Sequence, residues 1–128
     1  MSSTHPRVYI AGPITGIQNF NHKAFYSSGV ELWHLGFLPV NPHNICRHIL
    51  RSDFTTDEQH WQACLKADMP HIISAHYMLM LDGWQQSRGA CFERQIALTL
   101  GIPVFYSINE LEDMAVTIAS AMLAAHSH

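Results

Sequence analysis

Glu93 and Asp68 are the residues of this 128-residue sequence whose surroundings best suit acid–base or nucleophilic chemistry. Glu93 ends the segment GWQQSRGACFE, and Asp68 lies among apolar residues in CLKADMPHII. Two carboxyl groups in different environments can divide a reaction, because one stays ionised to attack while the other stays protonated to donate to a leaving group. A carboxylate can also attack the anomeric carbon of a sugar. Taken alone, each residue also fits another role. Glu93 fits a general base or a surface residue paired with Arg94 or a neighbouring loop, and Asp68 fits the cap of a helix.

The segment SRGA, just before Glu93, predicts an anion site at the start of a helix. The unpaired N–H groups of a first helical turn and the helix dipole both favour a negative charge. A phosphate there would bind the Ser87 hydroxyl and backbone amides, and the Arg88 side chain would add positive charge. The alternative is a plain N-cap, in which the Ser87 hydroxyl bonds only its own helix. The residues assigned to phosphate binding are Ser87, Arg88, Gly89 and Ala90.

Four further candidates come from the segment VYIAGPITG and from the turn before Ser87. AGPITG matches neither GxGxxG nor GxxxxGK[ST], so it predicts neither a dinucleotide fingerprint nor a Walker loop. We assign Gly12 and Ile14 to ligand contact, because small residues let a ligand approach the backbone; a tight turn without a ligand fits equally well. Tyr9 can point into the same pocket or pack within the sheet. The Trp84 side chain can stack on a base or cover one end of the hydrophobic core.

The elements that must position these residues alternate between strands and helices. The apolar pattern predicts strands at residues 7–11, 37–40, 77–81 and 103–107. It predicts helices at residues 21–35 and 89–100 and from residue 109 onward. A further helix should begin with Asp57 as its N-cap and should kink or restart at Pro70. Residues 41–56 are expected to be a loop or irregular turns.

This order predicts a single α/β domain over residues 1–128. Its sheet should be doubly wound, flavodoxin- or Rossmann-like and mostly parallel, with about four to five strands and helices on both faces. The strand at 37–40 should lie at an edge or begin at its proline. Ligands of such sheets bind outside the carboxyl ends of the strands, where the candidate segments converge.

Composition excludes several functional classes. A net charge of −3 gives no basic surface for a nucleic-acid polymer or a membrane. No apolar run has transmembrane length and the start lacks a signal-peptide core, so a cytoplasmic protein is expected. The three cysteines form no CxxC motif and the ten histidines show no ligand spacing near an acidic cluster, so no metal site and no cofactor are predicted.

Three segments together resemble the nucleoside 2-deoxyribosyltransferase-like superfamily over about residues 7–106. They are VYIAGPITG, ADMPHIISAHYMLMLDGW and SRGACFERQIALTLGIPVF. The sequence looks closest to small phage and bacterial members with a YIAGP…GW..S.GA..E pattern, and is similar to the 2′-deoxynucleoside 5′-monophosphate N-glycosidases. His76 departs from the Asp that many relatives carry before the third strand.

The resemblance implies roles for four residues. Glu93 falls on the nucleophile that attacks C1′ and forms a covalent deoxyribosyl ester, and Asp68 falls on the Asp that orients the sugar and assists departure of the base. Tyr9 falls on a tyrosine near the nucleophile. Ser87 falls on the serine that takes the 5′-phosphate in the nucleotide hydrolases, where the nucleoside transferases carry an acidic residue. A hydroxyl beside helix amides accepts a phosphate, whereas a carboxylate repels it.

The expected function is therefore an N-glycosidase acting on a (2′-deoxy)nucleoside 5′-monophosphate, modified bases included, through a covalent glycosyl-Glu intermediate. The alternatives are a deoxyribosyltransferase that exchanges bases and a non-catalytic nucleotide-binding module. The expected partners are the small nucleotide and a second copy of the chain, because the resemblance implies a homodimer or higher homo-oligomer.

Overall fold

The computed structural model describes residues 5–126. Its elements follow the predicted alternation, with short 3-10 helices (η) between them. The strands are β1 (Arg7–Ala11), β2 (Leu38–Val40), β3 (Tyr77–Met80) and β4 (Val104–Phe105). The helices are η1 (Gln18–Asn21), α1 (His22–His34), α2 (Pro42–Cys46), η2 (Arg51–Asp53), α3 (Asp57–Ile73), η3 (Trp84–Gln86), α4 (Arg88–Thr99) and α5 (Ile108–His126).

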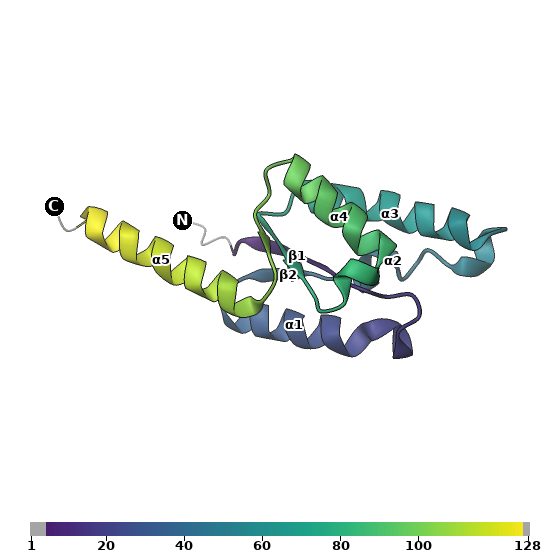
Figure 1. Ribbon diagram of the computed structural model, residues 1–128, viewed down its shortest axis with the longest axis horizontal. Helices are drawn as coiled ribbons and strands as arrows, with labels where there is room; N and C mark the ends of the chain where they lie inside the picture. The colour runs from purple at the N-terminus through teal and green to yellow at the C-terminus, as the bar shows by residue number, and fades with distance from the viewer. Residues whose placement is uncertain (1–4, 127–128) are drawn as a thin grey trace.

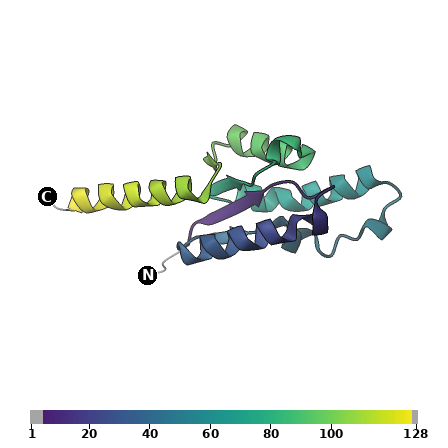
Figure 2. The ribbon, with the colours of Figure 1, turned by 60° about the horizontal axis from the view of Figure 1, so that its bottom comes forward.

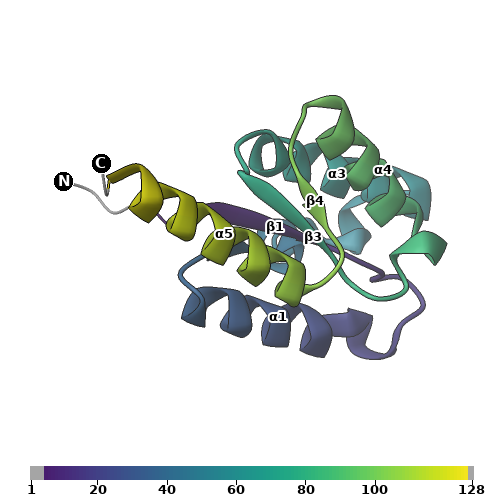
Figure 3. The same ribbon diagram turned by 60° about the vertical axis from the view of Figure 1, so that its left-hand side comes forward.

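The four strands form one parallel sheet in the order β2-β1-β3-β4. Figure 1 shows this sheet between two layers of helices, so the fold is a doubly wound α/β sheet as predicted. α1 and α5 lie side by side on one face (Figure 3), and α2, α3 and α4 cover the other. The chain order reverses between β1 and β3, which is the point where sheets of this class bind ligands.

The alternation of side chains along β1 sends its residues to two separate cores. Val8 and Ile10 pack toward α1 and α5, whereas Tyr9 and Ala11 pack toward α3 and α4. β3, paired in register with β1, divides its residues in the same way. A functional side chain on β1 can therefore meet α3 and α4 only from an odd-numbered position.

Several predicted boundaries are confirmed. β2 lies at the sheet edge. Pro39 has no N–H to donate, and it is tolerated there because one side of an edge strand has no partner strand. α1 ends before Gly36 and α4 before Gly101, and both glycines adopt positive φ, +94° and +73°. A residue with a side chain rarely adopts this backbone conformation, so glycine suits both helix ends.

Three local predictions were wrong. Residues 41–56 are not a loop throughout, because α2 begins at Pro42, capped by the Asn41 side chain, and η2 follows. Thr56, not Asp57, caps α3, and it forms a capping box with Gln59. Of the kink or restart predicted at Pro70, the restart is contradicted: α3 runs on to residue 73, because Pro70 lies in the exposed last turn, where water can donate to the carbonyl that the proline leaves without a partner.

The loop from β1 to α1 contains the most strained backbone among the described residues. Asn19, Phe20 and Asn21 all have positive φ, at 52°, 52° and 61°. Left-handed conformation costs about 1–2 kcal/mol for a residue with a Cβ, so other contacts must hold this turn. One of them is the Asn21 side-chain amide, which donates to the Pro13 carbonyl at 3.0 Å.

α5 begins in the core and then runs beyond the body of the molecule (Figures 1 and 2). Leu111 is fully buried near its start, whereas Val116 and Leu123 are 60% and 73% exposed. Ile118 and Met122 are exposed as well. None of the helices in the described part of the chain has the length and apolarity that a membrane crossing requires.

Candidate active site

Tyr9, Asp68 and Glu93 meet between the sheet and the helices that cover it. Tyr9 points from β1 toward this side, Asp68 lies in α3 and Glu93 in α4. The Tyr9 hydroxyl donates to Glu93 Oε2 at 2.6 Å. Asp68 lies beside them, since its negative charge raises the pKa of both Tyr9 and Glu93. Three residues from three different elements are thus brought together, and these are the residues that the sequence proposes for catalysis.

Asp68 and Glu93 are the only buried charged residues in the described part of the chain, each 6% exposed. A buried carboxyl group is costly unless it is paired or neutral. Burial is the main cause that raises the pKa of Glu93 well above its usual range, and the negative charge of Asp68 adds to the effect. The Tyr9 hydrogen bond opposes this rise, because it stabilises the ionised carboxylate.

Asp68 also has a raised pKa, and burial is again the main cause. The polar neighbours Glu93, Cys46 and Tyr9 partly offset that rise by stabilising its ionised form. Two interacting carboxyl groups of this kind titrate as a pair. The arrangement therefore retains a proton to higher pH than an exposed carboxyl would, with one group able to carry it while the other is ionised.

Cys46 contacts this pair and was not among the residues that the sequence indicated. Its Sγ lies 3.5 Å from Asp68 Oδ1 and 3.8 Å from the Cys64 carbonyl oxygen. The segment NICRHIL around it carries no motif. The contact exists because α2 packs against α3, which only the tertiary structure shows.

Ser87 is the N-cap of α4. Its Oγ accepts a hydrogen bond from the Ala90 N–H at 3.1 Å, as the plain-cap interpretation expects. An accepting hydroxyl still has its own hydrogen to donate, so capping and anion binding are compatible at this atom. Ala90 itself is buried, and its N–H is already bonded to Ser87.

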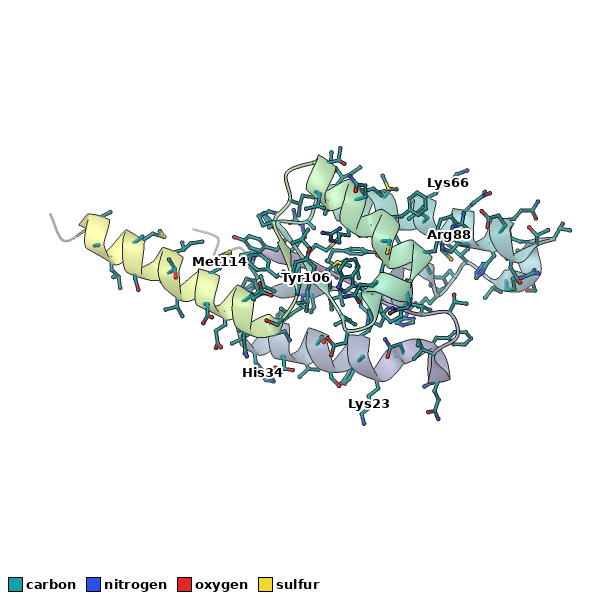
Figure 4. All side chains as sticks on the ribbon, in the orientation of Figure 1. Lys23, His34, Lys66, Arg88, Tyr106 and Met114 are labelled. Carbon is teal, nitrogen blue, oxygen red and sulfur yellow. The ribbon has the colours of Figure 1, made fainter. Side chains whose placement is uncertain are left out.

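Arg88 and Gly89 pack toward α3. The Arg88 guanidinium forms two bonds to the Glu58 carboxylate, at 2.6 and 2.9 Å, and lies 3.8 Å above the Trp61 ring. Figure 4 shows Arg88 at the end of α4 that lies beside α3. A Cβ on Gly89 would lie 3.4 Å from Trp61 Nε1, an ordinary van der Waals contact, so the packing against α3 does not require a glycine here.

Gly12 and Ile14 are not brought to the carboxyl pair. A Cβ on Gly12 would lie 2.8 Å from the Leu81 Cβ, so close packing between two neighbouring strands explains the glycine. Ile14 packs against the core beneath α1 and α5, on the face opposite Glu93.

Trp84 packs against the same core as Tyr9 and lines a cavity of about 470 Å³ beyond the carboxyl ends of β3 and β4. Its ring is 5.8 Å from that of Tyr106, and the Arg94 guanidinium lies 4.9 Å from the Trp84 ring. Tyr106 lies between α4 and α5 (Figure 4). The cavity is lined by Met80, Asp82, Gly83, Trp84, Gln85, Arg94 and Tyr106.

Within residues 5–126, no three His, Cys, Asp or Glu side chains are grouped so that they could hold a metal ion. Cys64 does contact a histidine, since its Sγ lies 3.6 Å from His60 Nε2. That nitrogen also lies 2.9 Å from the Ile49 carbonyl, so it must carry a proton to make this bond. His60 therefore cannot accept the thiol proton at that nitrogen, and the contact is not an activated Cys–His pair.

Comparison with known proteins gives one family and a related fold. The family described as Domain of unknown function (DUF4406) matches residues 6–106. A solved structure of a 2-deoxyribosyltransferase from the psychrotolerant bacterium Bacillus psychrosaccharolyticus is similar, with a TM-score of 0.56 and 23% sequence identity over 77% of this chain and 69% of that one. At this identity the likeness shows the fold. No curated protein sequence matches the chain.

Proposed function

The chain belongs to the DUF4406 family, and we propose that it is an N-glycosidase that cleaves the base–sugar bond of a (2′-deoxy)nucleoside 5′-monophosphate. Modified bases are included in the proposal. The observation that carries it is the buried contact of the Tyr9 hydroxyl with Glu93 Oε2, at 2.6 Å, beside Asp68. The fold shared with a deoxyribosyltransferase supports the same bond as the target.

The reaction begins when an ionised Glu93 carboxylate attacks C1′. A C1′–O bond forms to Glu93 as the C1′–N bond to the base breaks, and Asp68 donates its proton to the departing base. Water then attacks C1′ of the ester, with ionised Asp68 taking its proton, and Glu93 is released as a carboxylate. Asp68 ends the cycle protonated and Glu93 ionised, so both groups return to their starting states.

The coupled titration of the pair supplies the two protonation states that this reaction needs. Burial keeps one proton on the pair; the contacts with Glu93 and Cys46 favour ionised Asp68, whereas the Tyr9 hydrogen bond favours ionised Glu93. The proposed reaction requires the singly protonated pair with its proton on Asp68. A pair of this kind gives a bell-shaped dependence of rate on pH, because activity is lost when both groups are protonated or both are ionised.

The start of α4 is the proposed phosphate site. The Ser87 hydroxyl can donate to a phosphate oxygen while its Oγ keeps the bond from Ala90. The remaining first-turn amides and the helix dipole favour the same charge. Because Arg88 is already paired with Glu58, its contribution to phosphate binding requires that this ion pair opens.

Base exchange is the second candidate, favoured by the structural likeness to a 2-deoxyribosyltransferase. Both reactions share the covalent intermediate and differ in whether water or a free base attacks it. The wider proposal is a single-domain cytoplasmic enzyme without a cofactor that works as a homodimer or higher homo-oligomer. The exposed apolar side chains of α5 support self-association.

The experiment that tests this function is a chromatographic search for released base. The purified protein is incubated with the common deoxynucleoside monophosphates, their hydroxymethylated pyrimidine analogues and the matching ribonucleotides, with Glu93→Ala in parallel. The proposal expects base release by the wild type and none by Glu93→Ala. A nucleotide with a new base, formed when a second free base is supplied, would instead identify a transferase. Binding without turnover, kept in Glu93→Ala, would identify a binding module.

A further inference from the structure

We propose that Cys46 is a positioning residue for the carboxyl pair: its thiol donates a hydrogen bond to Asp68 Oδ1 and sets how the pair shares its proton. The inference deepens the proposed function, and its kinetic consequence depends on that function. Cys46 would not touch the substrate. It would act only through Asp68, from a helix that the sequence did not predict.

The geometry of α2 brings the thiol to Asp68. α2 is fixed at its start by the bond from His43 N–H to Asn41 Oδ1 at 2.9 Å, and it ends at Cys46. From there Sγ lies 3.5 Å from Asp68 Oδ1, within the range of a hydrogen bond from sulfur. Cys46 is half-buried, so this bond is partly shielded from water.

The thiol has one hydrogen and more than one acceptor nearby. The Cys64 carbonyl oxygen is 3.8 Å from Sγ, farther away than the Asp68 oxygen and uncharged. A hydrogen bond to an ionised group is about twice as strong as one between neutral groups, so Asp68 is the preferred acceptor whenever it is ionised. Burial and the charge of Asp68 raise the pKa of the Cys46 thiol, which therefore stays protonated as a donor.

Asp68 is faced by titratable groups from every element packed around it. Tyr9 faces it from β1 and Glu93 from α4. His71, in the same helix, adds a favourable charge when protonated. Cys64 is also nearby, but the thiol hydrogen bond to Asp68 comes from Cys46.

Removing this donor has a defined consequence for the pair. The Cys46 bond stabilises ionised Asp68, so without it the fully ionised pair loses stability and the pair keeps its proton to higher pH. We expect Cys46→Ala to move the alkaline limb of the rate profile upward by about half a pH unit. Because Asp68 is also less firmly oriented, kcat should fall severalfold while KM changes little.

The test compares three variants. Cys46→Ala removes the donor, Cys46→Ser replaces the thiol by another donor, and Cys64→Ala removes the neighbouring thiol from the same contact between α2 and α3. The carboxyl ¹³C resonances of Asp68 and Glu93 are titrated in each ligand-free protein, and kcat and KM are then measured against pH. Thermal unfolding checks that each variant is folded.

The proposal expects a shift of the carboxyl titrations upward in Cys46→Ala, partial or full return in Cys46→Ser, and wild-type titrations in Cys64→Ala. An equal shift in Cys64→Ala, or a serine variant that behaves as the alanine one, would overturn it in favour of a packing effect. Unchanged titrations in Cys46→Ala would also overturn it. If the wild type releases no base, the proposed function fails, and the carboxyl titrations still decide the role of Cys46.

Discussion

At the residue scale, the chemistry of Glu93 depends on one hydrogen bond and on the exclusion of water. The residue is 6% exposed, so little water reaches its carboxylate. The Tyr9 hydroxyl is the neighbour that favours its ionised state, while burial and Asp68 oppose that state. The balance among these three effects sets the pH range in which Glu93 can attack.

Tyr9→Phe should therefore lower activity and move its acidic limb to higher pH. Without the hydroxyl, the pKa of Glu93 rises further and less of it is ionised at neutral pH. A hydrogen bond to a charged group contributes about 1.5–3 kcal/mol, so kcat should fall at least tenfold at neutral pH. The measurement is kcat against pH for both proteins. A Tyr9→Phe profile that matches the wild type would contradict this role.

The same burial predicts how stability depends on pH. The pKa of Glu93 is higher in the folded protein than in the unfolded chain, so its contribution to stability is fully present below its usual value of 4.5 and is lost as the pH rises toward the folded value. Asp68 acts with the same sign. We expect Glu93→Gln to be more stable than the wild type at neutral pH, with the difference shrinking toward about pH 4.5. Urea unfolding across this range checks it; equal stabilities at neutral pH would contradict it.

At the scale of the elements, Ser87 has two separable tasks, as the cap of α4 and as a proposed phosphate ligand. Asp caps a helix about as well as Ser but repels a phosphate. Ser87→Asp should keep the free energy of unfolding within about 0.5 kcal/mol and raise KM for a nucleoside monophosphate at least tenfold. Ser87→Ala should cost about 1 kcal/mol of stability as well. Full activity of Ser87→Asp on the nucleotide, measured beside the free nucleoside, would remove the phosphate role.

Most of the strands and helices could be predicted from the sequence, because strands and long helices have clear apolar patterns. The four strands and α1, α3, α4 and α5 follow such patterns. α2 does not, since it has only five residues and its stability comes from the Asn41 cap and from packing on α3. The contact of Cys46 with Asp68 depends on α2 and was missed for the same reason.

The candidate site could be predicted only in part. Tyr9, Asp68 and Glu93 were assembled by resemblance to a family, since no spacing along the chain places residues of three elements together. Gly12 was assigned to a ligand because small residues permit a close approach; the close approach that the structure shows is to Leu81. Trp84 follows the third strand as expected and packs on the core that holds Tyr9, and its stacking on a base stays a prediction.

At the scale of the whole molecule, α5 is the part that the described fold leaves least covered. Its sequence has no charged residue from Met114 to Ala125, and its second half extends past the sheet (Figure 2). Exposed apolar surface of this kind favours association with another copy of the chain. The proposed homodimer would thus bury part of this helix.

The double variant Ile118→Glu with Leu123→Glu should shift the protein from a dimer to a monomer. Two buried, unpaired carboxylates would oppose an apolar contact strongly enough to reduce association at least a hundredfold. Light scattering after size exclusion measures the mass, and Thr117→Glu, at an exposed polar position that is not a helical neighbour of Ile118 or Leu123, is the control. A monomeric wild type, or a double variant that remains dimeric, would contradict this interface.

The covalent intermediate on Glu93 tests the central claim most directly. The protein is mixed with a nucleotide from which it releases base, quenched in acid during turnover, digested and examined by mass spectrometry. The proposed mechanism predicts a deoxyribosyl-phosphate adduct on the peptide that contains Glu93, absent from Glu93→Gln. Rapid base release without this adduct, with Glu93→Gln retaining activity, would contradict the nucleophilic role of Glu93.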